Sequence, residues 1–204
     1  MAKIAIDVVL LPSDEMMDEA IKLNRESLKT FDEKIILNKE NCLPHVSLAM
    51  GCIYEKDIPD IEETLQGIAK QHSFMSLRVI DIQTPITPTD EKASVLEIEK
   101  TKRLQLLHED IMKKLRPYFT YDVTADMLLS APRQVARSTL SWIKNYPQKS
   151  GFEDFSPHIT IGFGRIPELE SPINFTASRL ALCHLGNHCT CRKILISIEL
   201  KSQV

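Results

Sequence analysis

The chain has 204 residues, of which 43% are hydrophobic and 26% are charged. A chain of this size can bury a substantial core as one large domain, and its composition is not that of a disordered or fibrous protein. The formal net charge of −3 excludes a broad basic face that holds duplex nucleic acid through many phosphate contacts, although it leaves room for a local basic cleft.

The amino terminus is an almost unbroken apolar run over residues 4–11. This run is too short to span a membrane, contains Asp7, and lacks the charged lead and small-residue cleavage site of a signal peptide. We therefore expect a buried strand, followed by a helix that starts at Ser13, a good N-cap residue, and ends near Thr30. Residues 31–41 are mixed in character and receive no assignment.

Helices and strands are predicted to alternate through the rest of the first half. Apolar residues with the spacing of one buried stripe indicate helices over 57–71 and 101–116. His108 lies on the apolar side of the second helix and is expected to be a core residue with its hydrogen bonds satisfied. Strand patterns cover 76–83 and 93–99. The turn between these two strands is marked by Pro85, Pro88 and Asp90.

The stretch 120–155 is the least periodic part of the chain and is predicted to hold one helix, over about 131–146. The expected inner stripe of this helix is Val135, Thr139, Trp142 and Tyr146. The segment is locally basic through Arg133, Arg137, Lys144 and Lys149. Aromatic side chains beside cations can stack on a nucleobase, but we favour the interpretation that Trp142 packs inward while the cations are solvated.

Two strands over 174–184 and 190–200 are predicted near the end of the chain, joined by a hairpin whose tip is Gly186-Asn187. With the earlier elements this makes about seven strands and four helices. Such a mixture defines an α/β or α+β protein. The loop before the first of these strands is punctuated by Pro167 and Pro172.

The five cysteines are an odd number in a chain without a secretory signal, which favours reduced thiols and the cytoplasm. Three of them, Cys183, Cys189 and Cys191, lie close to His184 and His188. These residue types are found in zinc sites, but the spacing contains no Cys-x-x-Cys pair. A hairpin tip with incidental thiols is the favoured interpretation, and a regulatory metal site is the alternative.

One short phrase occurs twice, as Pro44-His45-Val46-Ser47-Leu48-Ala49-Met50-Gly51 and as Pro157-His158-Ile159-Thr160-Ile161-Gly162-Phe163-Gly164. The copies share proline, histidine, a β-branched apolar residue, a hydroxyl residue, an aliphatic residue and a closing glycine. Each copy alternates as a strand does, and the first is expected to continue to about Tyr54. Residues two apart in a strand point to the same face, so His45 should lie beside Ser47, and His158 beside Thr160.

A pair of histidines suits acid and base catalysis because imidazole titrates at about pH 6.5. If the two strands are neighbours, both imidazoles and both hydroxyls face one cleft. Hydroxyls donate hydrogen bonds to anionic oxygens without adding negative charge. The constellation fits phosphodiester chemistry without a metal, in which one histidine removes a proton from water or a ribose hydroxyl and the other protonates the leaving oxygen. The residues leave open which histidine is the base.

The tetrapeptides are His45-Val46-Ser47-Leu48 and His158-Ile159-Thr160-Ile161. Through these paired His-x-Ser/Thr-x motifs, and through its order of elements, the chain resembles the two-histidine (2H) phosphoesterase superfamily, in its 2′-5′ RNA ligase-like (LigT-like) branch. The resemblance implies an α+β, bilobal, pseudo-twofold fold in which antiparallel sheets flanked by helices surround a central cleft. Residues 1–204 would form this single domain, with 120–155 as an irregular excursion.

The same resemblance implies a cytoplasmic, monomeric phosphodiesterase that needs no metal or other cofactor and has no membrane partner. It would hydrolyse 2′,3′-cyclic phosphates or 2′-5′ linkages in RNA ends or small nucleotides, typically leaving a 2′-phosphate, and it could also run RNA ligation as the reverse reaction. His45 and His158 would be catalytic, and Ser47 and Thr160 would bind the phosphate.

The chain departs from the family pattern in two places. Many relatives carry an arginine shortly after the second hydroxyl, whereas here Phe163 follows and the nearest cation is Arg165. The segment between the motifs is also long, and 120–155 could serve as a lid or a substrate selector. The alternative to an enzyme is a nucleotide- or RNA-binding module that keeps the same cleft without turnover.

Overall fold

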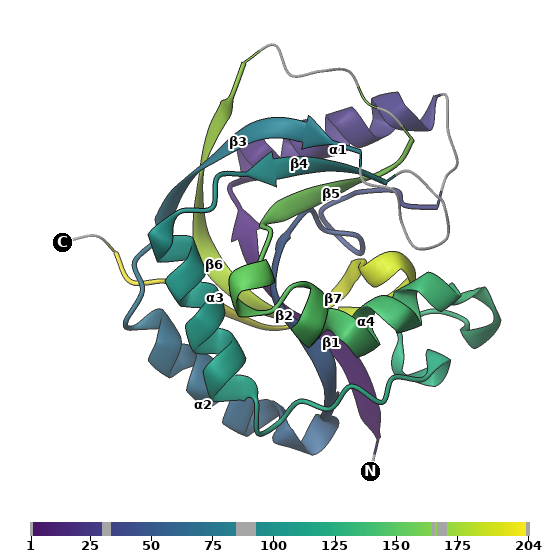
Figure 1. Ribbon diagram of the computed structural model, residues 1–204, viewed down its shortest axis with the longest axis vertical. Coiled ribbons are helices and arrows are strands. Elements are labelled where there is room, and N and C mark those ends of the chain that lie inside the picture. The colour runs from purple at the N-terminus through teal and green to yellow at the C-terminus, as the bar shows by residue number, and fades with distance from the viewer. Residues whose placement is uncertain (1, 30–33, 85–92, 165, 167–170, 203–204) are drawn as a thin grey trace.

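The computed structural model describes residues 2–29, 34–84, 93–164, 166 and 171–202. Within them, four α-helices and seven strands form a mixed helix and antiparallel-sheet structure (Figure 1), so the α+β prediction is confirmed. The helices are α1 (Asp14–Leu28), α2 (Ile58–Ala69), α3 (Lys102–Leu115) and α4 (Arg137–Lys149). The strands are β1 (Lys3–Pro12), β2 (Val46–Tyr54), β3 (Met75–Gln83), β4 (Ala93–Ile98), β5 (His158–Phe163), β6 (Ile173–Leu185) and β7 (Cys191–Glu199). Short 3-10 helices are η1 (Glu55–Asp57), η2 (Ala125–Met127), η3 (Pro132–Gln134), η4 (Phe152–Asp154) and η5 (Asn187–Cys189).

The described strands pair antiparallel in the order β1-β2-β5-β4-β3-β6-β7. β6 also pairs with β1, so that all of these strands except β7 close into a ring. The shortest ladder of the ring joins β2 and β5, and it contains one register pair, Val46 and Ile159. Because the two copies of the repeated phrase lie on β2 and β5, the fold brings both histidines to this junction.

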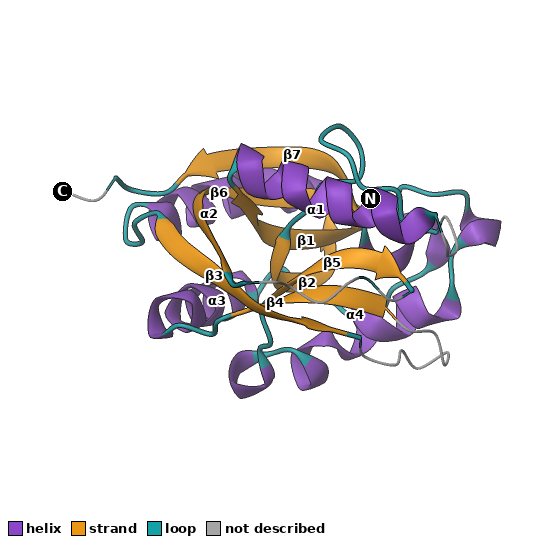
Figure 2. Cartoon of the chain, turned by 90° about the horizontal axis from the view of Figure 1, so that it is seen from above, coloured by secondary structure: helices purple, strands orange, loops and turns teal. Residues whose placement is uncertain are grey.

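β1 is buried along almost its whole length because it lies between β2 and β6 and because helices cover the ring. Figure 2 shows α1 lying across the strands, where it contacts β5. α2 and α3 pack against each other, and they contact β7 and β2, respectively. A strand buried on both faces is apolar throughout instead of alternating, which explains the run over residues 4–11.

Most predicted elements are present within a few residues of their expected bounds. Ser13 is the N-cap residue of α1 with an extended backbone, although no capping hydrogen bond from its side chain is recorded. None of the helices in the described part of the chain is long and apolar enough to cross a membrane. The predicted turn and loop residues that lie outside the described residues are Pro85, Pro88, Asp90 and Pro167.

The predicted helix over 131–146 was misplaced, because α4 begins at Arg137 and ends at Lys149. Its start is set by the hairpin tip, where Asn187 Oδ1 accepts hydrogen bonds from Ala136 N (2.9 Å) and Thr139 Oγ1 (3.0 Å). Sequence periodicity cannot detect a cap supplied by a distant residue. The side chains of α4 that are buried are Thr139, Ile143 and Tyr146.

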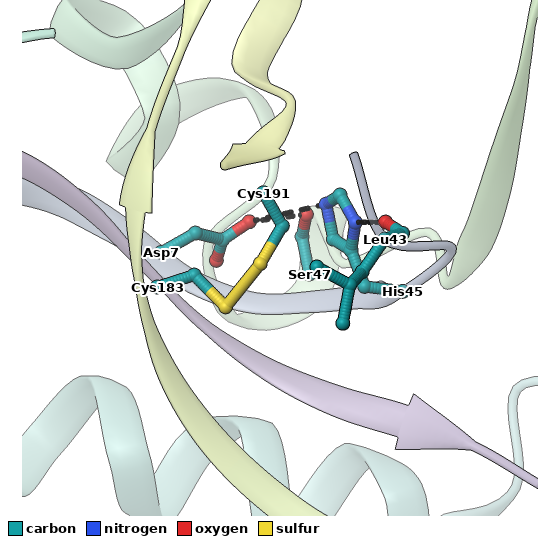
Figure 3. Close-up of a disulfide and its surroundings, with 6 residues drawn as sticks. All are labelled: Asp7, Leu43, His45, Ser47, Cys183 and Cys191. Carbon is teal, nitrogen blue, oxygen red and sulfur yellow. Dashed lines mark hydrogen bonds and ion pairs between the residues drawn. A yellow bond between two sulfur atoms is a disulfide. The ribbon is translucent and has the colours of Figure 1, made fainter. Parts of the chain in front are cut away.

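The prediction that all five cysteines are reduced thiols was wrong for one pair. Cys183 on β6 and Cys191 at the start of β7 form a disulfide (Figure 3), whereas the thiols of Cys42, Cys52 and Cys189 are free. The hairpin places the two bonded residues on neighbouring strands with their Cα atoms 5.6 Å apart, a separation that a disulfide can bridge. A metal site built on all three cysteines of the tip is incompatible with this bond.

Candidate active site

His45, Ser47, His158 and Thr160 all line one cavity of about 510 Å³. The cavity opens where β2 and β5 meet, so the expectation that both histidines and both hydroxyls face one cleft is confirmed as geometry. The contacts of each side chain decide which chemical role it can play.

The two imidazoles are held in the same way. His45 Nδ1 lies 2.7 Å from the Leu43 carbonyl oxygen, and His158 Nδ1 lies 2.8 Å from the Ser156 carbonyl oxygen. A carbonyl oxygen can only accept, so each Nδ1 carries the hydrogen. Each Nε2 is therefore the nitrogen left to take up or release a proton.

Each copy also contains a β-bulge directly after its hydroxyl residue. Leu48 is skipped in the register between β1 and β2, and Ile161 is skipped between β4 and β5. A bulged residue leaves its carbonyl without a partner in the ladder. Here a helix supplies the donor in both cases: His108 Nδ1 bonds the Leu48 oxygen at 2.6 Å, and Asn24 Nδ2 bonds the Ile161 oxygen at 2.7 Å.

His108 confirms the prediction of a satisfied core histidine. It is fully buried, its Nε2 accepts a hydrogen bond from Phe152 N at 2.8 Å, and its ring stacks on Phe155 with the centroids 4.1 Å apart. An acceptor nitrogen cannot carry a proton, so the ring is neutral with its hydrogen on Nδ1. Burial lowers the pKa of His108, in agreement with this state.

Both site histidines favour the neutral form in the free protein. Burial lowers the pKa of His45 and of His158 because the charged imidazolium loses its hydration. The hydrogen bond to a backbone carbonyl acts in the opposite direction in each case, and the neighbouring His158 lowers the pKa of His45 further. A neutral imidazole at neutral pH is ready to act as a base.

The two hydroxyls have different surroundings. Ser47 Oγ and Asp7 Oδ2 share a hydrogen bond of 2.6 Å, and the same carboxyl oxygen lies 3.8 Å from His45 Nε2. Figure 3 shows the Asp7 carboxyl pointing toward both side chains, with the disulfide beside it. For the Thr160 hydroxyl, no hydrogen-bond partner is recorded among the described residues. The two copies of the motif, although nearly identical in sequence, therefore differ in the hydrogen bonding of their hydroxyls.

Asp7 is a site residue that the repeated motif does not predict, because it lies on another strand, β1. It is fully buried on β1, and burial raises its pKa well above the ordinary value, against the opposing effect of the Ser47 hydrogen bond. The available signal was one acid inside a continuous apolar strand, since a buried charge is rare without a specific reason.

The α4 helix and the hairpin tip form one wall of the cavity, with Trp142, Lys149 and His188 among its lining residues. Trp142 is partly buried at the edge of the core, and Lys149 Nζ lies 5.9 Å from the centre of its ring. The interpretation that Trp142 is simply a core residue was therefore incomplete. Phe163 also lines the cavity, and Arg165, the cation nearest to it in sequence, lies outside the described residues.

Comparisons with known proteins agree with this geometry. The sequence matches the model of the 2′-5′ RNA ligase superfamily over residues 26–187. TT0787 of Thermus thermophilus has a similar structure, with a TM-score of 0.62 at 12% identity over 98% of this chain and 100% of that chain. E. coli LigT is also similar, both in apo form (0.57, 13%, 100% and 100%) and complexed with 3′-AMP (0.58, 11%, 98% and 100%). Curated proteins give no match.

A ring of antiparallel strands with two histidine-hydroxyl pairs at one cavity defines the two-histidine phosphoesterase class of fold. The chain belongs to the 2′-5′ RNA ligase superfamily, which confirms the resemblance drawn from its two tetrapeptides. Membership in this superfamily supports a phosphoesterase type of function. No group of three or more histidine, cysteine, aspartate or glutamate side chains in the described ranges is placed to hold a metal ion.

Proposed function

We propose that this protein is a metal-independent cyclic phosphodiesterase, related in activity to 2′-5′ RNA ligases, that uses two-histidine acid–base catalysis. Its substrates are 2′,3′-cyclic phosphates or 2′-5′ linkages in RNA ends or small nucleotides. The observation that carries the proposal is the pair His45 and His158 in one cavity, each with Nδ1 bound to a backbone carbonyl and Nε2 left for proton transfer.

In hydrolysis of a 2′,3′-cyclic phosphate, the neutral histidine takes a proton from water while the water oxygen forms a bond to phosphorus. The bond between phosphorus and the 3′ oxygen breaks, and the protonated histidine gives its proton to that oxygen. The product is a 2′-phosphate with a free 3′ hydroxyl, and exchange with solvent restores both imidazoles. In the ligation direction a ribose hydroxyl takes the place of water.

Substrate binding favours the uptake from solvent of the proton that the acid needs. Burial lowers the pKa of both imidazoles in the free protein. A phosphodiester anion beside them favours the charged form, because an opposite charge within about 4–6 Å raises the pKa of a histidine. One of the two rings is then protonated in the complex while the other remains a base.

The composition of the cavity supports a nucleotide-sized substrate. Apart from histidines, the charged residues among its described lining are Lys149 and Glu97, whose charges cancel, and most of the surface that lines the cavity is apolar. A long polynucleotide requires many cations along its path, whereas a diester has a single negative charge. The complex of E. coli LigT with 3′-AMP is in keeping with a nucleotide ligand.

The test is turnover of a panel of 2′,3′-cyclic nucleotides and 2′-5′-linked oligonucleotides in the presence of a chelator. His45→Ala and His158→Ala should each lower kcat/KM by about 10²–10⁴-fold, because each removes one proton transfer. His184→Ala is the matched control, since that ring bonds the Met127 carbonyl and does not line the cavity.

Two outcomes contradict the proposal. Wild-type protein that turns over no member of the panel is not this enzyme, and saturable nucleotide binding without product would instead favour the non-catalytic binding module. Activity that is unchanged in both His45→Ala and His158→Ala would reject the proposed catalysts even if turnover is seen.

A further inference from the structure

The register of the sheet shows at which strand position the two halves of the site carry different residues. Asp7 on β1 stands opposite Met50 on β2, the third residue after Ser47. In the second copy, the third residue after the hydroxyl is Phe163, and the residue opposite it is Ala93. Both ladders carry their bulge at the same place, so Asp7 and Ala93 are equivalent positions. One copy has a buried acid where the other has a methyl group.

We propose that Asp7 is a positioning residue that carries a proton during catalysis and orients the Ser47 hydroxyl toward the substrate phosphate. The proposal rests on the phosphodiesterase function proposed above and adds a positioning residue to that site. The Asp7 carboxyl lies 2.6 Å from Ser47 Oγ and has no exposed surface.

The direction of one hydrogen bond decides what Ser47 can do. If Asp7 is ionised, the carboxylate accepts the only hydroxyl hydrogen of Ser47, which then has none for the substrate. If Asp7 carries a proton on Oδ2, it donates to Ser47 Oγ across the same distance, and the serine hydrogen is free to turn toward a phosphate oxygen. An ionised Asp7 would also place a second negative charge near the phosphate.

The surroundings of Asp7 favour the protonated form. The described titratable groups near it are His45 beside β2, Tyr146 of α4 and Cys189 of η5. Burial is the largest influence and raises the pKa of Asp7, whereas hydrogen bonds from Ser47 and from the Ala49 backbone act in the opposite direction. Burial raises the pKa of Tyr146 and of Cys189, which keeps both neutral. No described lysine or arginine forms an ion pair with the carboxyl, and burial lowers the pKa of His45, which favours its neutral form in the free protein. Oδ1 has no hydrogen-bond partner among the described residues, so an ionised carboxylate would keep one oxygen unsolvated.

The proposal predicts an alkaline limb in the pH profile. A carboxyl with a raised pKa is protonated at low pH and loses its proton as the pH rises through that value. Activity that depends on protonated Asp7 is therefore lost on the alkaline side. Asp7→Asn has a neutral side chain that can donate to Ser47 at every pH, so the variant should keep its activity and lose this part of the alkaline limb.

The experiment compares kcat and KM from about pH 5 to about pH 10 for wild type, Asp7→Asn, Asp7→Ala and Ser47→Ala. At neutral pH, Asp7→Asn should stay within about threefold of wild type in kcat/KM, while Asp7→Ala should lose about 10- to 100-fold because Ser47 has lost its partner. Asp110→Asn is the matched control, since that carboxylate bonds His72 away from the cavity. In the Ser47→Ala background, Asp7→Asn should have no further effect.

The proposal is overturned if Asp7→Asn loses as much activity as Asp7→Ala, keeps the wild-type alkaline limb, or retains its effect without Ser47. Asp7→Asn is nearly isosteric, so the test survives if Asp7→Ala does not fold. Calorimetric binding of inorganic sulfate separates this proposal from the proposed function. If no substrate is turned over, wild-type affinity for sulfate must still fall more steeply with rising pH than that of Asp7→Asn, and equal pH dependence rejects the role of Asp7.

Discussion

At the scale of single residues, the site is built by donors and acceptors that stand outside the repeated phrase. Asn24 and His108 each bond the carbonyl released by a bulge, and Asp7 bonds the hydroxyl of one copy only. A local motif can show which side chains do chemistry, but not which distant side chains hold them. The two histidines were therefore predictable from the sequence, and so was the burial of His108, whereas the partners of Asn24, His108 and Asp7 were not.

His108 makes stability depend on pH. Its pKa is lowered in the folded protein, so the unfolded chain binds the proton more readily. Stability should be fully present above about pH 6.5, the unfolded value, and should fall as the pH drops through the lower folded value, where protonation of Nε2 breaks the bond from Phe152 N. Thermal unfolding of wild type and His108→Gln between about pH 5 and pH 8 measures this.

The quantity to compare is the change in melting temperature with pH in wild type and in His108→Gln. The comparison is needed because His45 and His158 also have lowered pKa values, which affect the melting curves of both proteins. His108→Gln does not titrate, so its melting temperature should fall less between neutral and acidic pH than that of wild type. Parallel curves for the two proteins would show that protonation of His108 does not weaken the fold.

At the scale of elements, α4 is positioned by the hairpin tip and in turn supplies one wall of the cavity. Asn187 fixes its first turn, and Trp142 faces the cavity two turns from the end of the helix at Lys149. Periodicity predicted a helix in this stretch but not its bounds, because the residue that sets the start is far away in sequence. We therefore propose that this helix is the part of the irregular segment 120–155 that contributes to substrate choice.

Trp142→Ala should weaken binding of substrates that carry a nucleobase. Stacking of a base on an aromatic ring contributes about 1–3 kcal/mol, so KM for a 2′,3′-cyclic nucleotide should rise about 5- to 150-fold, while kcat changes little. Ribose 2′,3′-cyclic phosphate, which has no base, should be affected far less. Lys144→Ala on the exposed face of α4 is the control. An equal rise in KM for both substrates would mean that Trp142 shapes the cavity without contacting the base.

At the scale of the whole molecule, the pattern of apolar residues was enough to predict an α+β chain. The pairing of the two histidine strands was only a condition in the sequence analysis, and the β2–β5 ladder meets it. We propose that the narrow β2–β5 junction divides residues 1–204 into two lobes of one domain, each with its own bulge and helix donor. The disulfide was not predictable, because its formation depends on β6 and β7 lying side by side. For this reason, the odd number of cysteines led to the wrong prediction that Cys183 and Cys191 are reduced.

The Cys183–Cys191 disulfide should stabilise the fold as a whole. It closes a loop with a sequence separation of 8, for which chain entropy predicts a contribution of roughly 2–3 kcal/mol. Dithiothreitol should therefore lower the melting temperature of the wild type, and the Cys183→Ser/Cys191→Ser variant should melt at this lower temperature with or without reductant. The loss should reach the site as well, because Leu43 N bonds the Cys191 carbonyl and the Leu43 carbonyl holds His45. A wild type that is fully reduced by mass spectrometry, yet unchanged in melting temperature, would show that the bond does not contribute to stability.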